Sequence, residues 1–516
     1  MAFSVPPSVS GVKPPFDKVL VANRGEIAVR VIRTLREMGI RSVAIYSEAD
    51  RAALHVRMAD EAYCVGPAVA AESYLRMDKV LDVARKSGAK AVHPGYGFLS
   101  ENAKFAKACE DAGIVFIGPS STAIHSMGSK TGARAIMEKA GVPVVPGGTA
   151  ANLEDARREA KRIGYPVMLK ASAGGGGKGM RLVEKEEDLA SAWDRARSEA
   201  AKAFGNDDVY LEKGIIKPRH VEIQVLGDKH GKVVHLFERD CSIQRRHQKV
   251  VEETPCPAAS DELVAKMGAI AVQGAKAVGY HSAGTFEFLL DADGSFYFLE
   301  MNTRLQVEHP ITELITGTDL VREMILIAAG AKLPFDQAGV QRRGSAIECR
   351  VYAEDPSADF MPSPGKIIAL RTPSGPGVRD DGGAYPGCTI SSFYDPLVSK
   401  LSVWAPDRPR AIAKMRRALA EYVVTGIRTN LAFHEKLFAH PEFIAGHYDT
   451  DFIPRHRDAL MGYAETHHSD ESALAVALAL AAARIDRRTG AEGAAEEERG
   501  ARLSPWVAAH RSRLNG

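Results

Sequence analysis

The stretch Phe298-Leu-Glu-Met-Asn-Thr-Arg-Leu-Gln-Val-Glu-His-Pro310 says more about the fold than any other part of the chain. Its polar residues occupy every second position: Glu300, Asn302, Arg304, Gln306 and Glu308. Successive side chains of an extended chain point to opposite faces. The spacing therefore predicts a strand with carboxylates, amides and a guanidinium along one face. A solvated edge strand would show the same alternation, so the neighbouring sequence has to decide.

The residues before this stretch predict a buried hairpin. Thr285–Leu290 is expected to form a strand, Asp293-Gly294 a tight turn, and Phe296–Leu299 the partner strand. Buried carboxylates need a compensating cation, and Glu287 and Glu300 on adjacent strands could share one. Oxygen ligands of this kind suit Mg²⁺, which keeps waters and binds substrate phosphates.

Composition favours a soluble enzyme-sized protein over a nucleic-acid or membrane protein. The chain has 516 residues, enough for roughly three domains, with 45% hydrophobic and 26% charged residues and a net charge of +2. Such a charge gives no argument for nucleic acid or membrane, and we see no apolar run of membrane-spanning length. Residues 1–16 resemble a short leader without targeting features. The scattered cysteines, which fit free thiols in a reducing, cytoplasmic compartment, are Cys64, Cys109, Cys241, Cys256, Cys349 and Cys388.

Residues 1–125 alternate predicted strands and helices, which indicates a doubly wound, parallel sheet. Strands are expected at 18–23, 42–46, 89–92 and 114–118. The first turn, Asn23-Arg-Gly-Glu26, lacks the three glycines of a dinucleotide fingerprint. The loop His93–Asn102 contains two glycines and a proline, and we expect a functional or interdomain role for it.

Three further segments follow. Residues 126–345 hold the phosphate and carboxylate features, with a lid at about 142–215, and residues 346–455 form a mixed α+β domain. The latter has predicted strands at 346–352 and 400–404 and a helix at 408–422. Residues 456–516 are alanine-rich and then charged. This tail is either a docking segment for partner subunits or a disordered remnant.

A glycine-rich loop, Gly174–Gly179, lies between predicted strands at 166–170 and 180–183. A dinucleotide loop would have to open a helix, and a P-loop would need Ser or Thr after Gly-Lys, so neither fits. The remaining interpretation is a hairpin that folds over nucleotide phosphates, with Lys170 as a charge partner. A surface loop without function is the alternative.

Two other charged segments have less certain meaning. A predicted strand at 209–213 ends in Glu212-Lys213 and could present the glutamate to an adenine or a ribose, or merely form a surface salt bridge. Arg245-Arg-His-Gln-Lys249 is basic, but no aromatic residues interleave, so a small-anion site is favoured over nucleic acid.

Together these segments resemble the biotin carboxylase component of biotin-dependent carboxylases, a branch of the ATP-grasp superfamily. The resemblance runs in order from about Phe16 to His456. It rests on Asn23–Ile27, His93–Asn102, Gly174–Gly179, Arg245–Lys249, Glu300–Glu308, Glu348–Arg350 and Pro362–Gly365. It implies a Rossmann-like N-terminal domain, a central ATP-grasp domain with a lid, and an α+β C-terminal domain. The implied reaction uses MgATP and bicarbonate to carboxylate biotin through carboxyphosphate.

The resemblance also implies roles for individual residues. ATP would be bound by Lys130, Lys170, Gly175, Gly176, Gly177, Glu212, Lys213, His220, Gln244, His247 and Leu289. Mg²⁺ or Mn²⁺ would be bound by Glu287, Glu300 and Asn302. Bicarbonate would be positioned by Lys249, Arg304, Gln306 and the Val307 backbone, with Glu308 as its base. Arg350 would stabilise the biotin enolate, with Tyr96 beside biotin.

The implied chemistry suits these residue types. A free glutamate, with a pKa of roughly 4.3, is a poor base for bicarbonate. Arg304 and Lys249 would therefore have to stabilise the developing dianion. Carboxyphosphate decomposes in water, so a closing lid is expected. A guanidinium at position 350 is always charged, and lysine should replace it poorly.

Partners follow from the same resemblance. Biotin is attached in this family to a lysine flanked by methionines, and no methionine of this chain precedes a lysine. A separate biotin carboxyl carrier protein and a separate carboxyltransferase are therefore expected, with a homodimer as the family habit. Two other hypotheses stay open at this point: another bicarbonate-activating ATP-grasp ligase, and a catalytically inactive scaffold subunit.

Overall fold

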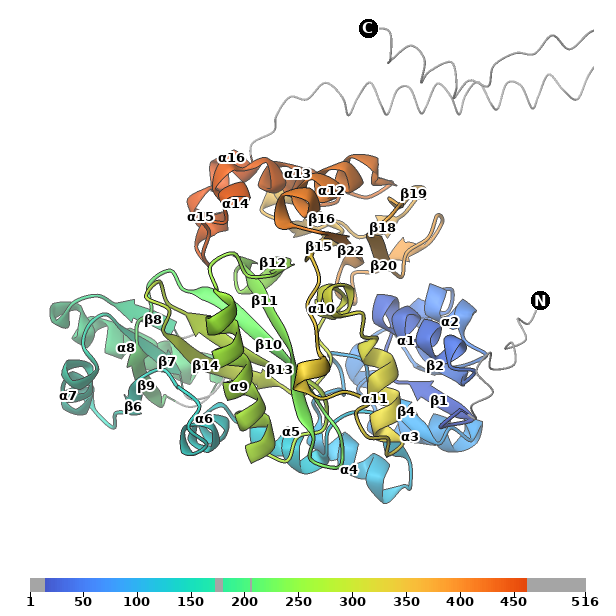
Figure 1. Ribbon diagram of the computed structural model, residues 1–516, viewed down its shortest axis with the longest axis horizontal. Coiled ribbons are helices and arrows are strands. Elements are labelled where there is room, and N and C mark those ends of the chain that lie inside the picture. Colours follow the sequence, from blue (N-terminus) through green and yellow to red (C-terminus); the bar gives the residue numbers. More distant parts are fainter. Residues whose placement is uncertain (1–13, 172–179, 205–206, 462–516) are drawn as a thin grey trace, which may run out of the picture. The chain divides into compact units, whose positions relative to one another are not determined.

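The computed structural model describes residues 14–171, 180–204 and 207–461 (Figure 1). The chain divides into two units, Met1–Met461 and Gly462–Gly516, and all described residues belong to the first. Most of the expected leader, the Gly174–Gly179 loop and most of the expected tail lie outside the described residues. None of the helices in the described ranges combines the length and apolarity that a membrane crossing requires.

The N-terminal segment contains the predicted parallel sheet. Its strand order is β3-β2-β1-β4-β5, and every pairing is parallel. The strands are β1 (Lys18–Val21), β2 (Arg41–Ser47), β3 (Glu61–Gly66), β4 (Ala91–His93) and β5 (Val115–Phe116). The helices are α1 (Gly25–Glu37), α2 (Leu54–Met58), α3 (Met77–Ser87), α4 (Ala103–Asp111) and α5 (Ser121–Gly128). The expected doubly wound class is confirmed. Sequence reasoning did not find the edge strand β3, which is mostly only half-buried and lacks an apolar run.

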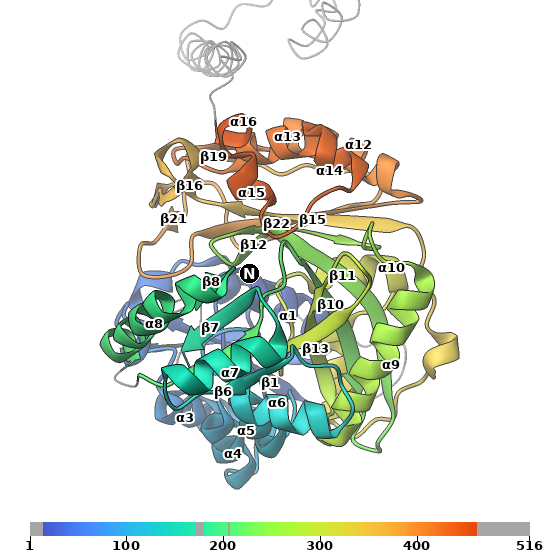
Figure 2. The same ribbon diagram turned by 90° about the vertical axis from the view of Figure 1, so that its left-hand side faces the viewer.

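A small antiparallel sheet, in the order β6-β9-β7-β8, forms the region expected to be the lid. Its strands are β6 (Gly147–Thr149), β7 (Val167–Ala171), β8 (Met180–Val183) and β9 (Val209–Lys213). The helices α7 (Leu153–Ile163) and α8 (Leu189–Phe204) lie beside this sheet (Figure 2). They bury Ala156 and Trp193 against Leu169 and Leu211. Lys170 pairs with Met180, so the glycine-rich segment connects the two strands of a hairpin, as predicted.

One eight-stranded sheet forms the centre of the molecule, in the order β14-β13-β10-β11-β12-β15-β22-β20. Its strands are β10 (Arg219–Gly227), β11 (Val233–Arg245), β12 (Gln248–Thr254), β13 (Ser282–Leu290), β14 (Phe296–Asn302), β15 (Ser345–Tyr352), β20 (Val378–Gly382) and β22 (Leu397–Ala405). Because β12 pairs with β15, the sheet crosses the expected domain boundary at 345/346 without a break.

The predicted hairpin exists, but the predicted strand after it is too long. β13 and β14 pair antiparallel with Glu287 directly opposite Glu300. β14 ends at Asn302, however, so the extension of the strand to Glu308 is wrong. The chain leaves the sheet because α10 (His309–Thr316) begins at once, with Pro310 in its first turn. Leu305 turns into a core that it shares with α1 and β1.

The remaining elements surround the central sheet. The helices are α6 (Lys130–Lys139), α9 (Asp261–Ala277), α11 (Leu320–Ala328), α12 (Arg408–Glu421), α13 (Leu431–Ala439), α14 (Pro441–Ala445), α15 (Phe452–Arg455) and α16 (Arg457–Met461). Short strands pair beside them: β16 (Glu354–Asp355), β17 (Met361–Pro362), β18 (Gly365–Lys366), β19 (Ala369–Arg371), β21 (Thr389–Ile390) and β23 (Val423–Thr425). Leu460 of α16 is 1% exposed and packs in the C-terminal core. The packed structure thus continues past residue 456, where we expected the tail to begin.

Candidate active site

Lys249 on β12 lies at the centre of the candidate site. Its ammonium nitrogen is 2.8 Å from Glu287 Oε1, 2.7 Å from Glu308 Oε1 and 2.5 Å from Glu222 Oε2. Burial alone would lower the pKa of Lys249, but these three carboxylates hold it well above its usual value. One fixed cation therefore joins an expected metal ligand to the expected base.

Glu308 also contacts Arg350, from β15. Arg350 Nη2 is 3.0 Å from Glu308 Oε2, and its Nε donates to Glu252 Oε1 at 2.7 Å. Burial favours the neutral form of Glu308, but Lys249, Arg350 and Arg239 outweigh burial and hold its pKa below the usual range. For Glu252 burial wins, and its pKa rises to about 8. Glu308 is thus ionised at neutral pH and is a weak base in this arrangement.

The segment after β14 gathers its polar side chains although it is not a strand. Asn302 Nδ2 and Gln306 Nε2 donate to Glu287 Oε1 at 2.9 and 3.0 Å. Arg304 donates to Asn302 Oδ1 at 3.0 Å and to Gln306 Oε1 at 3.1 Å. Arg304 Nε also donates to Glu101 at 2.9 Å. Hydrogen bonds, rather than strand periodicity, bring these residues together. One of these bonds, from Arg304 to Glu101, also connects them to the His93–Asn102 loop.

Glu287 and Glu300 form the candidate metal site. Burial raises the pKa of Glu300, and the charge of Glu287 raises it further, whereas Lys130 acts in the opposite direction. Burial would also raise the pKa of Glu287, but Lys249 and His220, whose Nε2 is 3.0 Å away, hold it well below normal. Two facing carboxylates with mutual repulsion, beside the amide of Asn302, fit a hard divalent cation such as Mg²⁺.

Several expected nucleotide-binding residues pair with one another or lie beside residues of this cluster. Glu212 pairs with Lys170 and, at 3.0 Å, with Arg134, so it forms a buried ion pair rather than a surface salt bridge. Leu289 lies opposite His220 in the β10–β13 register. Lys130 begins α6 and acts electrostatically on Glu300.

Three other residues expected to bind the nucleotide either donate to backbone carbonyls or lie at the surface. The Lys213 ammonium is turned to the Gly164 and Tyr165 carbonyls at 3.0 and 3.1 Å, away from Glu212. Gln244 donates to the Cys241 carbonyl at 2.8 Å, while His247 lies at the exposed tip of the β11–β12 turn. The positions 175–177 fall outside the described residues.

Sequence reasoning missed several buried charges in the site. Arg239 is 0% exposed and donates to Glu222 Oε1 at 2.5 Å and to Gln224 Oε1 at 2.8 Å. The sequence did contain a signal for Glu222. His220, Glu222 and Gln224 occupy alternate positions of an apolar strand, as Glu300 and Asn302 do. The buried Glu252 and Lys400 gave no comparable signal, and neither did the exposed Glu101 that contacts Arg304.

Lys400 lies next to both Tyr96 and Val307, and Val307 belongs to the segment expected to position bicarbonate. The Lys400 ammonium is 5.8 Å from the Tyr96 ring and donates to the Val307 carbonyl at 2.8 Å. Asn23 Nδ2 holds the Tyr96 carbonyl at 2.7 Å. The two positions expected near biotin and bicarbonate are thus neighbours of one lysine.

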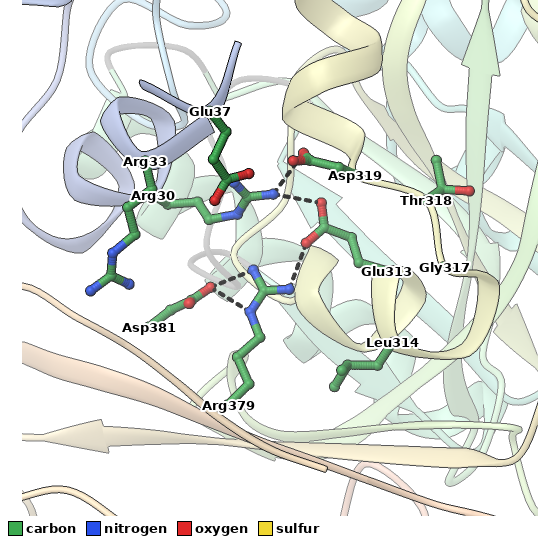
Figure 3. A pocket seen from close by; sticks show the side chains of 10 residues that line it. All are labelled: Arg30, Arg33, Glu37, Glu313, Leu314, Gly317, Thr318, Asp319, Arg379 and Asp381. Atoms are coloured by element: carbon green, nitrogen blue, oxygen red, sulfur yellow. Dashed lines mark hydrogen bonds and ion pairs between the residues drawn. The ribbon is translucent and has the colours of Figure 1, made fainter. Parts of the chain in front are cut away.

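A second charged cluster lies outside the expected site and lines a cavity (Figure 3). Arg30 of α1 pairs with Glu313 of α10 at 3.0 Å and with Asp319 at 2.8 Å. Arg379 of β20 pairs with Glu313 at 2.7 Å and with Asp381 at 2.6 Å. These pairs tie the N-terminal segment, α10 and the far edge of the central sheet together.

Comparison with known families matches three successive parts of the chain. The biotin carboxylase N-terminal domain matches residues 15–124, and the biotin carboxylase C-terminal domain matches residues 348–455. The ATP-binding domain of the carbamoyl-phosphate synthase L chain matches residues 129–335. The flanking matches separate this chain from ATP-grasp enzymes that share only the central domain.

Similar proteins support the same assignment. Biotin carboxylase 1 of Bacillus subtilis is 54% identical over 439 residues, covering 84% of this chain and 98% of the relative. The methylcrotonoyl-CoA carboxylase α subunit of Dictyostelium discoideum, mitochondrial by its name, is 51% identical, covering 97% of this chain and 71% of the relative.

A solved structure shows the same architecture. The biotin carboxylase domain dimer of Hydrogenobacter thermophilus 2-oxoglutarate carboxylase, in complex with MgADP, ADP and bicarbonate, has a TM-score of 0.82. It is 49% identical and covers 87% of this chain and 99% of its own. The three-domain architecture and the ATP-grasp assignment are thus confirmed, and the chain belongs to the biotin carboxylase family, whose members are ligases that carboxylate biotin in an ATP-dependent reaction.

Proposed function

We propose that this chain carboxylates biotin presented by a separate carrier protein, using MgATP and bicarbonate, with carboxyphosphate as intermediate. The observation that carries the proposal is the position of Lys249. It contacts both Glu287, the expected metal ligand, and Glu308, the expected base, and Glu308 contacts Arg350. The residues expected to act on phosphate, bicarbonate and biotin are therefore linked by one connected set of contacts, which supports the proposal.

Bicarbonate activation is assigned to Lys249, Arg304 and Glu308. With Lys249 and Arg350 both on its oxygens, Glu308 is too weak a base. An anion that draws Lys249 toward itself would remove part of that positive field and raise the pKa of Glu308. Glu308 could then accept the bicarbonate proton while Lys249 and Arg304 stabilise the developing dianion.

Glu287, Glu300 and Asn302 would hold the metal. Bound Mg²⁺ or Mn²⁺ would neutralise phosphate charge and help to align the transferring phosphoryl group. Glu287 contacts Lys249 and His220, while burial and the charge of Glu287 raise the pKa of Glu300. Lys130 and Lys170 supply positive charge on the nucleotide side, and the hairpin between β7 and β8 would exclude water from carboxyphosphate.

Arg350 is the residue proposed to act on biotin. Its guanidinium is buried and oriented by Glu252 at 2.7 Å, with a second nitrogen on Glu308. A planar, permanently charged group held in this way can donate to a developing enolate oxygen. Tyr96, beside Lys400 and Val307, would contact the same substrate.

The partners are proposed on similar grounds. A biotin carboxyl carrier protein, a carboxyltransferase and a second copy of the chain are the expected assembly, in the cytoplasm. The Dictyostelium relative is named for methylcrotonoyl-CoA and the Hydrogenobacter protein for 2-oxoglutarate. The final acceptor therefore varies among similar chains, as expected if the transferase selects it.

Steady-state ADP release tests this function. Purified protein is assayed with MgATP and bicarbonate, with and without free biotin. Stimulation by biotin supports the proposal. Bicarbonate-dependent release that ignores biotin would indicate another bicarbonate-activating ligase, and no release at all would indicate a scaffold.

A further inference from the structure

Lys400 on β22 is a fully buried cation that none of the assigned roles uses. It is 0% exposed, donates to the Val307 carbonyl at 2.8 Å and lies 3.3 Å from Glu26 Oε2. Burying an ammonium group costs free energy unless it is paired and hydrogen-bonded. Its retention in the core, next to the bicarbonate segment, therefore calls for an explanation.

The partner of Lys400 comes from the other end of the chain. Glu26 is 5% exposed and belongs to the first turn of α1. Among the described residues, its carboxylate oxygens have no hydrogen-bond partner apart from the ion pair with Lys400. On the opposite side Asp381 is the cross-strand neighbour of Lys400 and is itself paired with Arg379 (Figure 3). Lys400 thus lies between two carboxylates, with one hydrogen bond directed at the main chain.

That hydrogen bond acts on the peptide that precedes Glu308. The Val307 carbonyl belongs to the peptide linking Val307 to Glu308, and the carboxylate of Glu308 contacts Lys249 at 2.7 Å and Arg350 at 3.0 Å. The segment 303–308 has no strand pairing to fix it. A hydrogen bond to the Val307 carbonyl therefore constrains the position of the Glu308 backbone, from which the carboxylate extends.

The Asn23–Glu26 turn brings the N-terminal segment to the same place. Asn23 donates to the carbonyls of Pro94 and Tyr96 at 2.8 and 2.7 Å, which holds the loop that carries Tyr96. A side chain at Gly383 would place its Cβ 3.0 Å from the Glu26 amide nitrogen. The absence of a side chain there allows the chain after β20 to approach α1, so that Glu26 and Lys400 can meet.

We infer that Lys400 and Glu26 form a positioning pair: Lys400 holds the Val307–Glu308 peptide in place for bicarbonate activation, and Glu26 holds Lys400. Neither residue touches the reacting atoms. The inference rests on the proposed function, because it needs Glu308 to act on bicarbonate. It also explains the Asn23–Ile27 motif, to which no role was assigned.

The test compares Lys400→Met, Glu26→Gln and the double variant in the full chain, with free biotin as the acceptor. Lys400→Met removes the donor and leaves Glu26 unpaired in the core, so we expect both a lower melting temperature and a large loss of kcat. We expect kcat for biotin-dependent ADP release to fall at least tenfold and KM for bicarbonate to rise, with KM for ATP within about twofold of wild type.

The double variant separates positioning from stability. It contains no unpaired buried charge, so its melting temperature should recover relative to Lys400→Met, because coupled residues are not additive. The carbonyl of Val307 still lacks its donor, so kcat should stay low. Recovery of kcat together with stability would overturn the inference, since it would show a merely structural pair.

Ser402→Ala is the matched control. Ser402 also lies on β22 and donates to the buried Glu348 at 2.7 Å, but it makes no contact with Val307 among the hydrogen bonds of the described residues. It should lower stability and leave kcat within twofold. If wild-type protein shows no biotin-stimulated turnover, the proposed function fails. If wild-type protein turns over and Lys400→Met matches it, only the positioning role fails.

Discussion

At the scale of single residues, Lys249 determines the charge state of the site. Three carboxylates, from Glu222, Glu287 and Glu308, share its ammonium. Glu287 and Glu308 have further cations and stay ionised, whereas Glu300, farther from these cations and close to Glu287, has a raised pKa. Removing Lys249 would therefore disturb both the proposed metal ligand, Glu287, and the proposed base, Glu308.

The geometry of the Arg350 contacts predicts that lysine cannot replace this residue. Its two donors contact Glu252 and Glu308 at once, which the single ammonium of a lysine cannot reproduce with the same planarity. Arg350→Lys should lower kcat for biotin-dependent ADP release by roughly 100-fold, with little change in KM for ATP. The measurement is steady-state ADP release at saturating biotin.

Arg408→Lys is the control for that variant. Arg408 pairs at 2.7 Å with Glu253, which follows Glu252 on β12, and it faces the C-terminal core. The same substitution there should reduce the melting temperature and leave kcat nearly unchanged. Equal losses of kcat in both variants would contradict a specific role for Arg350.

Glu348 gives a prediction about pH. Burial raises its pKa from the usual 4.5 to about 7 and outweighs the opposing effects of Lys400, of the hydrogen bond from Ser402 and of Arg350. Its neutral form is favoured in the folded protein, so its contribution to stability is complete below pH 4.5 and is lost as pH rises through 7. Relative to wild type, Glu348→Gln should gain up to about 3 kcal/mol between pH 5 and 8.

Urea unfolding of both proteins at several pH values measures this difference. The control is Glu435→Gln, since Glu435 is an exposed carboxyl on α13 outside the site. A pH-independent difference between wild type and Glu348→Gln would show that Glu348 is ionised in the fold throughout.

At the scale of elements, the sequence predicted the β13–β14 hairpin but not the course of the chain after it. Alternating apolar residues and the Asp293-Gly294 turn were enough to place Glu287 opposite Glu300. The same alternation continues to Glu308, where the chain is not a strand, because α10 begins at His309 and no neighbour pairs with 303–308. Side-chain hydrogen bonds between distant elements decide that course, and local periodicity contains no information about them.

The facing carboxylates of this hairpin predict a metal-dependent gain in stability. MgADP at about 100 times its Kd should stabilise the wild-type protein by about 2.7 kcal/mol. Glu300→Gln should lose most of the part that requires Mg²⁺, as measured by melting temperature with MgADP against ADP plus chelator. Glu323→Gln, on α11 outside the site, should retain it. A full Mg²⁺ effect in Glu300→Gln would exclude Glu300 as a ligand.

At the scale of the whole molecule, sequence reasoning found the order of the segments, but not that the central and C-terminal segments share one sheet. The strand–helix rhythm predicted the N-terminal sheet, and the resemblance to biotin carboxylases placed the central and C-terminal parts. The pairing of β12 with β15, and of β15 with β22, joins those two parts into one sheet. Long-range pairing of this kind leaves no trace in composition or local periodicity, so the expected boundary at 345/346 could not reveal it.

The end of the packed structure gives a prediction about truncation. A chain that ends at Met461 retains Leu460, which is 1% exposed, and should keep wild-type melting temperature and turnover of free biotin. A chain that ends at His456 loses this side chain from the core and should be destabilised by about 2–5 kcal/mol. Equal stability of the two would show that α16 does not contribute to the core.

The same truncation tests the tail. If the residues after Met461 dock partner subunits, the shorter chain should co-purify less carrier protein and carboxyltransferase than the full chain while retaining turnover of free biotin. Unchanged co-purification would exclude the docking hypothesis.

The central claim, that one connected site carries bicarbonate through to biotin, is tested most directly by following the carbon. Protein is incubated with MgATP, labelled bicarbonate and free biotin, and acid-labile label on biotin is measured beside ADP. We predict one labelled carboxybiotin for each biotin-stimulated ADP in the wild-type protein, and loss of labelled biotin in Arg350→Ala. Biotin-stimulated ADP release without label on biotin, or equal labelling by Arg350→Ala, would contradict the account.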